Sequence, residues 1–309
     1  MNEETTYEEL RGRIDELLAP CLAQDWPNMA AARAKGVYVY DRDGKRYIDF
    51  LAGFGACNAG HNHPRIVAAA QEQMQRMVHA PAGVMAHEPM LRLAHELASV
   101  VPGGADMFFF GNSGSEAVDG ALKMARYVTG RSDFIAFLGS FHGRMLGGTA
   151  VTASKVAYRR GHGPHLPGVH FARFPYPYRS AAPSEEACVD EALGDIERLF
   201  EYVVAPDDVA AMLVEPVQGE GGYIFPPRGW LQSLRDICDE HGILLIFDEV
   251  QAGFGRTGQW FAADLYGVQP DVVCLAKAIA NGFPLSAVGA RGEIMGEWGS
   301  ASHGTTYGG

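Results

Sequence analysis

The sequence has few basic residues for its length: 25 Lys and Arg stand against 37 Asp and Glu, giving a formal net charge of -12 at pH 7. A chain this acidic is poorly suited to bind nucleic acid or an anionic membrane surface, so neither is expected as a partner. No apolar run approaches the roughly 20 residues that cross a bilayer. Small molecules and other protein surfaces remain as the expected partners.

Cysteine is also scarce, and the five present are scattered without any Cys-x-x-Cys pair: Cys21, Cys57, Cys188, Cys238 and Cys274. An odd, dispersed set is typical of reduced thiols rather than of a disulfide framework. The acidic N-terminus has no basic flank followed by an apolar core, so we expect no signal peptide and a cytoplasmic location.

Histidines with the spacing of metal ligands are missing as well. His61 and His63 are too close together for a helical pair, and His162 and His165 have no evident acidic or Cys partner. We therefore expect no metal site.

What the sequence does contain is a series of short apolar runs that alternate with helical patterns. The runs cover residues 107–110, 134–138, 210–214, 243–247 and 272–275. Helical apolar spacing covers residues 116–128 and 230–238, and Gly242 ends the second helix. This alternation predicts an α/β fold with a mainly parallel central sheet and helices on both faces.

Two further segments fall outside this pattern. Residues 36–50 predict a β-hairpin in the N-terminal segment, with two short strands around an Asp43-Gly44 turn. Residues 180–191, rich in Ala, Ser and Glu, predict a surface connection.

The residues after each apolar run are the candidates for function, because ligands bind beyond the carboxyl ends of the strands of an open parallel sheet. After the first run comes a small polar loop that opens a helix, Gly111-Asn112-Ser113-Gly114-Ser115-Glu116. Free N–H groups at the positive end of a helix dipole suit a phosphate. The same residues fit an N-cap in a tight turn without any ligand, because Ser is a common cap and Glu suits a first turn.

An aromatic ring, an imidazole and a cation follow the second run, in Phe141-His142-Gly143-Arg144. Phe141 could stack on a planar ligand, and Arg144 could pair with a carboxylate through two hydrogen bonds. A core aromatic beside a solvated arginine explains the same residues without a ligand.

Charged residues follow the other three runs. Glu215 and Glu220 lie with Gln218 in a glycine-rich loop. Asp248 comes directly after the fourth run, where a carboxylate is costly to bury unless it is paired, and an ion pair or helix cap is its structural alternative. Lys277 comes shortly after the fifth run. A desolvated lysine has a lowered pKa and becomes a nucleophilic amine, which a Schiff base with a carbonyl requires.

A phosphate loop, a stacking aromatic, a carboxylate and a lysine are together the parts needed to hold pyridoxal phosphate. A serine hydrolase fits less well, because the loop around Ser113 lacks the Gly-x-Ser-x-Gly spacing of a nucleophile elbow.

Six segments resemble, in order, the motifs of class III aminotransferases, which are pyridoxal-phosphate-dependent enzymes of fold type I. They are FFFGNSGSEAVDGALKMAR, SFHGR, EPVQGEGG, LLIFDEVQAGFGRTG, LAKAIANGFPLSAV and HGTTYGG, and the resemblance covers about residues 36–309. Arg144 after Phe-His-Gly, with GPHLPGVHFARFPYPYR downstream, is most similar to 4-aminobutyrate and related ω-amino-acid aminotransferases.

The resemblance implies catalytic, substrate and subunit roles. Lys277 would hold the cofactor as a Schiff base and then shuttle a proton, and Asp248 would pair with the pyridinium N–H. Arg144 would take the distal carboxylate of the amino donor, and Glu220 would pair with an arginine of a C-terminal domain. Thr306 would reach the phosphate of the neighbouring subunit in a homodimer.

The resemblance also implies the cofactor contacts. Gly114 and Ser115 would bind the phosphate through their backbone. Phe141 and Val250 would stack on the two faces of the ring, and Gln251 would reach the phenolic oxygen. The remaining expected site residues are Ser113, His142 and Glu215 at the cofactor and Phe54 at the substrate.

The resemblance implies an N-terminal segment at residues 1–50 that belongs to a small domain and a large cofactor-binding domain at 51–309. The C-terminal small domain of the family is expected to be absent from this sequence. The implied activity moves an amino group from an ω-amino acid, such as 4-aminobutyrate, ornithine or acetylornithine, to a 2-oxo acid such as 2-oxoglutarate. An amino-acid racemase or epimerase on the same scaffold needs the same Lys277 and Asp248. A non-catalytic fragment is a third interpretation.

Overall fold

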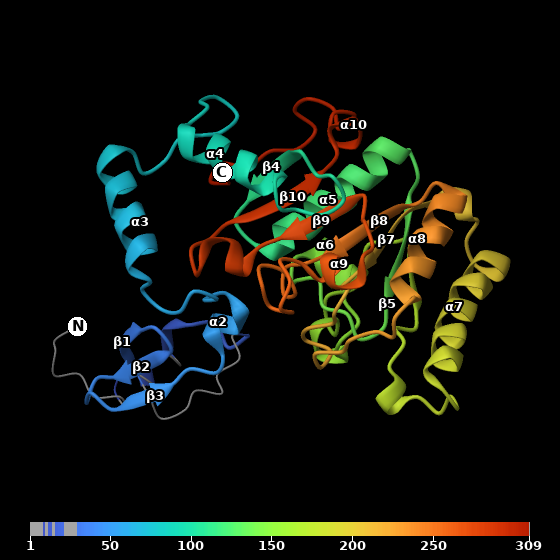
Figure 1. The fold of residues 1–309 in the computed structure, drawn as a ribbon, viewed down its shortest axis with the longest axis horizontal. Coiled ribbons are helices and arrows are strands. Elements are labelled where there is room, and N and C mark those ends of the chain that lie inside the picture. Colours follow the sequence, from blue (N-terminus) through green and yellow to red (C-terminus); the bar gives the residue numbers. More distant parts are fainter. Residues whose placement is uncertain (1–8, 10–11, 14–15, 22–29, 309) are drawn as a thin grey trace.

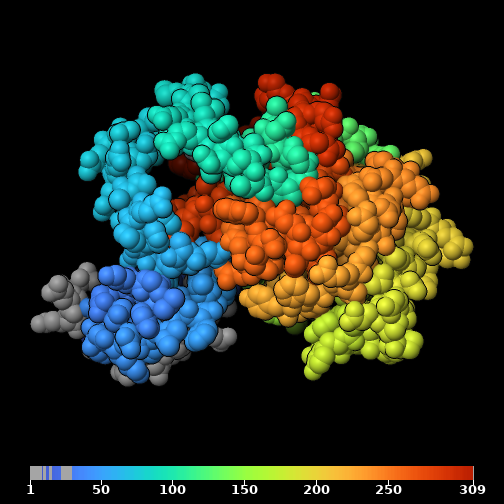
Figure 2. Space-filling model, viewed as in Figure 1, coloured from blue at the N-terminus to red at the C-terminus, as the bar shows by residue number. Residues whose placement is uncertain are grey.

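The computed structural model describes residues 9, 12–13, 16–21 and 30–308. These residues include two separate β-sheets (Figure 1). A small sheet near the N-terminus projects from one side of a larger α/β body, to which the segment with α2 and α3 connects it (Figure 2). The larger body contains the strands predicted for the central sheet and the helices predicted between them, and the small sheet contains the predicted hairpin.

The small sheet has three antiparallel strands in the order β1-β2-β3: β1 (Ala31–Lys35), β2 (Tyr38–Asp41) and β3 (Arg46–Ile48). The predicted hairpin is confirmed in β2 and β3. Asp41 accepts a hydrogen bond from the Lys45 N–H across the turn, and Gly44 has the left-handed φ of +83° that the turn requires. The strand β1 was not predicted, because most of its side chains are exposed and it has no apolar pattern.

Seven strands form the central sheet: β4 (Met107–Gly111), β5 (Asp133–Phe137), β6 (Val169–Ala172), β7 (Val209–Val214), β8 (Leu244–Asp248), β9 (Val272–Leu275) and β10 (Ser286–Ala290). Their order is β4-β10-β9-β8-β7-β5-β6, and all neighbours are parallel except that β10 runs antiparallel to β4 and β9. The five predicted strands and the mainly parallel sheet are confirmed. The carboxyl ends of these five strands therefore lie at the same edge.

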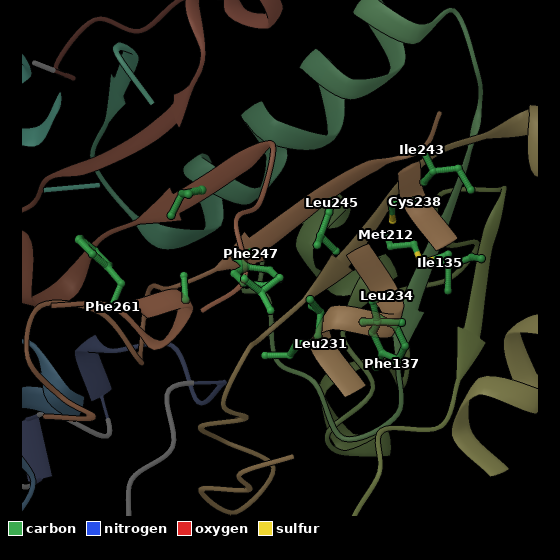
Figure 3. Close-up of a cluster of buried hydrophobic side chains, with 14 of the residues drawn as sticks. Ile135, Phe137, Met212, Leu231, Leu234, Cys238, Ile243, Leu245, Phe247 and Phe261 are labelled. Carbon is green, nitrogen blue, oxygen red and sulfur yellow. The ribbon is translucent and has the colours of Figure 1, made fainter. Parts of the chain in front are cut away.

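The sheet is buried on both faces, which explains its continuous apolar strands. Residues alternate along each strand: Met212 and Leu245 face the cluster packed against α8, while Leu213 and Ile246 face the cluster packed against α5. Figure 3 shows the first of these clusters, in which Leu231 and other residues of α8 lie over the sheet. The predicted covering by helices on both faces is confirmed.

The helices among the described residues are α2 (Ala52–Gly55), α3 (Pro64–Arg76), α4 (Glu88–Ala98), α5 (Gly114–Thr129), α6 (Leu146–Val151), α7 (Glu185–Tyr202), α8 (Trp230–His241), α9 (Ala262–Tyr266) and α10 (Gly292–Met295). Short 3-10 helices are η1 (Val156–Tyr158), η2 (Pro177–Arg179), η3 (Pro206–Asp208) and η4 (Lys277–Ala280). No helix in the described part of the chain is long and apolar enough to cross a membrane.

One prediction about this layer is wrong. The segment 180–191 was expected to be a surface connection, but α7 begins at Glu185. Ser184 caps it by accepting a hydrogen bond from the Ala187 N–H at 3.1 Å, and Cys188 on its inner face is buried. The many charged residues are simply its solvent-facing side.

Candidate active site

A cavity of about 840 Å³ opens at the carboxyl edge of the central sheet. Its walls come from the residues that follow β4, β5, β7, β8 and β9, as expected for a ligand site in such a sheet. Every predicted site residue except Thr306 lines it: Phe54, Ser113, Gly114, Ser115, Phe141, His142, Arg144, Glu215, Glu220, Asp248, Val250, Gln251 and Lys277.

The N-terminus of α5 forms one wall. Ser113 is its N-cap, with the Oγ accepting a hydrogen bond from the Glu116 N–H at 3.3 Å, so the capping role weighed for this loop is real. The cap satisfies one N–H group, and other N–H groups of the first turn are left for a ligand because they have no partner inside the helix. Position 114 has no room for a side chain, because a Cβ there would lie 2.8 Å from Cγ1 of Val250. The wall can therefore bind an anion through backbone N–H groups.

Asp248 lies at the floor of the cavity, at the end of β8. Its side chain is buried, and its Oδ2 lies 2.7 Å from Nδ1 of His142. Its Oδ1 accepts a hydrogen bond from the Val250 N–H at 3.1 Å. The carboxylate is thus paired with His142 and with a backbone N–H group, and Asp248 still lines the cavity.

Lys277 follows β9 and is half-buried, and its Nζ donates a hydrogen bond to Oε1 of Gln251. Burial lowers the pKa of this amine, although the carboxylates of Asp248 and Glu215 act in the opposite direction. A lowered pKa leaves more of the lysine neutral and nucleophilic near pH 7. Asp248 and Lys277 therefore present a carboxyl group and an amine to the same cavity.

Glu215, at the end of β7, is buried with both carboxylate oxygens engaged. Oε1 accepts from the Phe141 N–H at 2.7 Å, and Oε2 accepts from the Gly219 N–H at 2.8 Å. Burial, aided by Asp248, raises the pKa of Glu215 to about 7 against the opposing effects of His142 and the two N–H groups.

The outer wall of the cavity consists of the side chains of Phe141, Arg144, Tyr158 and Glu220. The Arg144 guanidinium lies 4.3 Å from the ring centre of Tyr158, whose ring meets that of Phe141 edge to face. Glu220 accepts hydrogen bonds from Lys155 Nζ at 2.6 Å and from the Tyr158 hydroxyl at 2.7 Å. Among the described residues, Glu220 thus pairs with Lys155, and its pairing with an arginine of a C-terminal domain stays a prediction.

Sequence reasoning missed Tyr158 and Lys155. They lie on and beside the short helix η1, which follows no apolar run, so the rule that pointed to the strand ends gave no signal there.

Thr306 is the one predicted site residue that does not line this cavity. Its side chain is exposed, yet the segment around it is anchored at both ends. The ring of His303 packs 4.7 Å from that of Phe109 and its Nδ1 lies 2.9 Å from Lys123 Nζ. Buried Gly308 fits so closely that a Cβ would lie 2.5 Å from the Phe110 carbonyl oxygen. The segment thus presents Thr306 outward from a fixed position.

The mainly parallel sheet, the N-terminus of α5, half-buried Lys277 and buried Asp248 define an α/β protein with a lysine-containing cavity at the strand ends, where a helix N-terminus is open to an anion. Residues 22–309 match the family Aminotransferase class-III, and the chain belongs to this family.

The sequence is 43% identical over 284 residues to the 5-aminovalerate aminotransferase DavT of Pseudomonas aeruginosa, covering 91% of this chain and 65% of that protein. It is 42% identical over 302 residues to the 4-aminobutyrate aminotransferase GabT of Escherichia coli, covering 97% of this chain and 69% of that protein. An alanine/serine racemase of Pyrococcus horikoshii is 39% identical over 269 residues, which cover 85% of this chain and 57% of that protein. The matched residues thus span between 57% and 69% of the length of these relatives.

Solved structures agree with this assignment. The taurine:2-oxoglutarate aminotransferase of Bifidobacterium kashiwanohense, solved in complex with PLP and glutamate, superposes with a TM-score of 0.91 at 33% identity, covering 100% of this chain and 70% of that one.

Proposed function

We propose that the cavity binds pyridoxal phosphate and that the chain carries the active site of an aminotransferase. The observation that carries this proposal is the meeting of Lys277, buried Asp248 and the N-terminus of α5 in one cavity. The cavity volume of about 840 Å³ lies in the range typical of sites for small organic ligands. An anion cradle, a buried carboxylate and an amine of lowered pKa fit the phosphate, the ring nitrogen and the aldehyde of this cofactor.

When bound, pyridoxal phosphate supplies an aldehyde for an amine and a ring that draws electrons from a substrate carbon losing its proton. Lys277 would attach to it covalently and, once displaced by substrate, move a proton over a short distance. Asp248, held by His142, would keep the ring nitrogen protonated. Phe141 and Val250 would cover the ring, and Gln251 would orient it beside Lys277.

We propose an ω-amino acid as amino donor and a 2-oxo acid such as 2-oxoglutarate as acceptor. Arg144 supports this choice, because its guanidinium lines the cavity and has no ion pair among the described residues. It can therefore bind a distal carboxylate of the donor. The exposed rings of Phe54 and Phe50 at the mouth of the cavity would contact the chain of the donor.

Substitution of Arg144 tests this choice of donor. In single-turnover reactions of the cofactor-loaded chain, Arg144→Ala should slow 4-aminobutyrate and 5-aminovalerate about 30-fold or more, the loss expected for a charge-assisted pair. Butylamine, which has no carboxylate, should react almost unchanged. Arg160→Ala, which changes an exposed arginine outside the cavity lining, is the matched control. Equal losses for both donor classes would make Arg144 a structural residue.

A racemase is the second candidate, because the relative from Pyrococcus horikoshii shows that the family includes one. The two activities separate in a mixture with one amino acid and no 2-oxo acid. A racemase continues until both enantiomers are present, whereas an aminotransferase stops after one turnover per site. Chiral chromatography of alanine and of 2-aminoadipate distinguishes these results.

We further propose that a second copy of the chain completes the site. The support is Thr306, which is exposed on an anchored segment and does not line its own cavity. Thr306 would donate to the phosphate in the partner's cavity. Mixing Lys277→Ala chains with Thr306→Val chains should then restore one intact site per hybrid dimer, and absence of any restored activity would contradict the shared site.

The compartment and the domain division are also proposals. The five cysteines are all unpaired, which favours the reducing cytoplasm. The separate small sheet favours a division near residue 50 between an N-terminal segment, belonging to a small domain, and the cofactor-binding domain at 51–309.

A further inference from the structure

Glu215 connects two loops of the cavity through its carboxylate. One oxygen accepts from the Phe141 N–H at 2.7 Å in the loop after β5, and the other accepts from the Gly219 N–H at 2.8 Å in the loop after β7. Each oxygen is therefore already committed to the protein backbone. Glu215 still lines the cavity, and its expected contact with the cofactor stays a prediction.

Both loops contribute residues to the outer wall of the cavity. The first continues from Phe141 to Arg144, and the second continues from Gly219 to Glu220. The loops also fit tightly against each other elsewhere, since a Cβ on Gly221 would lie 2.4 Å from the Gly139 carbonyl oxygen. The spacing between Arg144 and Glu220 thus depends on how the two loops are held together.

We propose that Glu215 is a positioning residue whose ionised carboxylate fastens the Phe141–Arg144 loop to the Gly219–Glu220 loop and so sets the spacing of the wall that receives the donor. Protonation weakens this clamp, because a neutral carboxyl has one good acceptor oxygen and loses the charge that strengthens both bonds. The consequence for donor binding rests on the proposed function, but the clamp itself does not.

The surroundings of Glu215 oppose its ionisation. The charged and titratable groups around it are His142 after β5, Asp248 at the end of β8 and Lys277 after β9. Burial is the largest effect and raises the pKa from 4.5 to about 7. Since this folded-state pKa is raised, the contribution of Glu215 to stability is present at low pH and is lost as the pH rises through about 7. The two hydrogen bonds of Glu215 are therefore strongest above pH 7, where the ionised carboxylate lowers the stability of the fold most.

The test follows the Phe141 and Gly219 amides by NMR in the cofactor-free chain, so its outcome does not depend on the proposed function. In the wild-type chain both amide protons should move downfield together between pH 5.5 and 8.5, with a midpoint near 7. Glu215→Gln should abolish this shared titration. It should also raise the exchange rate of at least one of the two amides about 10-fold, because an amide side chain offers one acceptor oxygen instead of two.

Glu249→Gln is the matched control, because Glu249 is also buried at the end of a strand but binds the Ala263 N–H instead. This variant should retain the shared titration of Phe141 and Gly219. Two amides that do not titrate in the wild-type chain, or that titrate unchanged in Glu215→Gln, would overturn the proposal. If Glu215→Gln does not fold, the absence of a shared titration in the wild-type chain still overturns the proposal.

Discussion

Glu249 provides a sharp test of the electrostatics at the end of the central sheet. It follows Asp248, is fully buried, and its Oε1 accepts a hydrogen bond from the Ala263 N–H at 2.8 Å. Its Oε2 has no hydrogen-bond partner among the described residues. Burial is the main cause that raises its pKa from 4.5 to about 8, with Asp264 and Asp248 acting in the same direction.

This pKa fixes the sign and size of the effect on stability. A carboxyl whose folded-state pKa is raised contributes stability that is present below pH 4.5 and is lost as the pH rises through about 8. Because one pKa unit is worth about 1.4 kcal/mol, the full loss is on the order of 5 kcal/mol. Glu249→Gln keeps the shape and the acceptor for Ala263 but cannot ionise, so it does not suffer this loss.

The assay is thermal unfolding of both proteins from pH 5 to pH 9. The difference in melting temperature, Glu249→Gln minus wild type, should increase by roughly 5–10 °C from pH 5 to pH 9. Glu240→Gln, which changes an exposed glutamate of α8, should follow the wild-type curve. Parallel curves for wild type and Glu249→Gln would refute the assignment of a buried, reluctantly ionised carboxyl.

Two further predictions concern the cofactor site. Asp248→Asn should leave the cofactor bound but slow single-turnover transfer from an amino donor about 100-fold or more in stopped-flow absorbance, and an unchanged rate would contradict its role at the ring nitrogen. Gly114→Ala should weaken cofactor binding about 10-fold in fluorescence titration, because the new Cβ would lie 2.8 Å from Cγ1 of Val250. The double variant with Val250→Ala should recover part of that affinity, and a double variant as weak as the single one would place the cause elsewhere.

Much of the fold could be predicted because the strands of a sheet covered on both faces are continuous apolar runs. β7 and β8 are such runs, and their ends were predicted within one residue. The strands β6 and β10 were not predicted, because neither is a strong apolar run. β6 is short and includes His170, and β10 consists largely of small residues. An antiparallel strand such as β10 is also not expected from an alternation of strands and helices.

The location of the candidate site was predictable for the same reason. Parallel strands bring their carboxyl ends to one edge, so Asp248 and Lys277 had to lie near each other. The direction of each side chain was not predictable. Glu215 lines the cavity, but nothing in the sequence indicated that its two oxygens accept hydrogen bonds from backbone N–H groups of two different loops. Tyr158 reaches the outer wall through a long-range contact with Glu220 that no local pattern indicates.

The central claim is that Lys277 binds pyridoxal phosphate covalently, and borohydride reduction of the cofactor-loaded chain tests it most directly. Mass spectrometry of the digested protein should find a pyridoxyl group on the peptide that contains Lys277. Lys277→Ala should lose both the label and the visible absorbance, while Lys155→Met, which removes the lysine that binds Glu220, should keep both. A label on Lys155 or on any other lysine, with the absorbance retained in Lys277→Ala, would contradict the account.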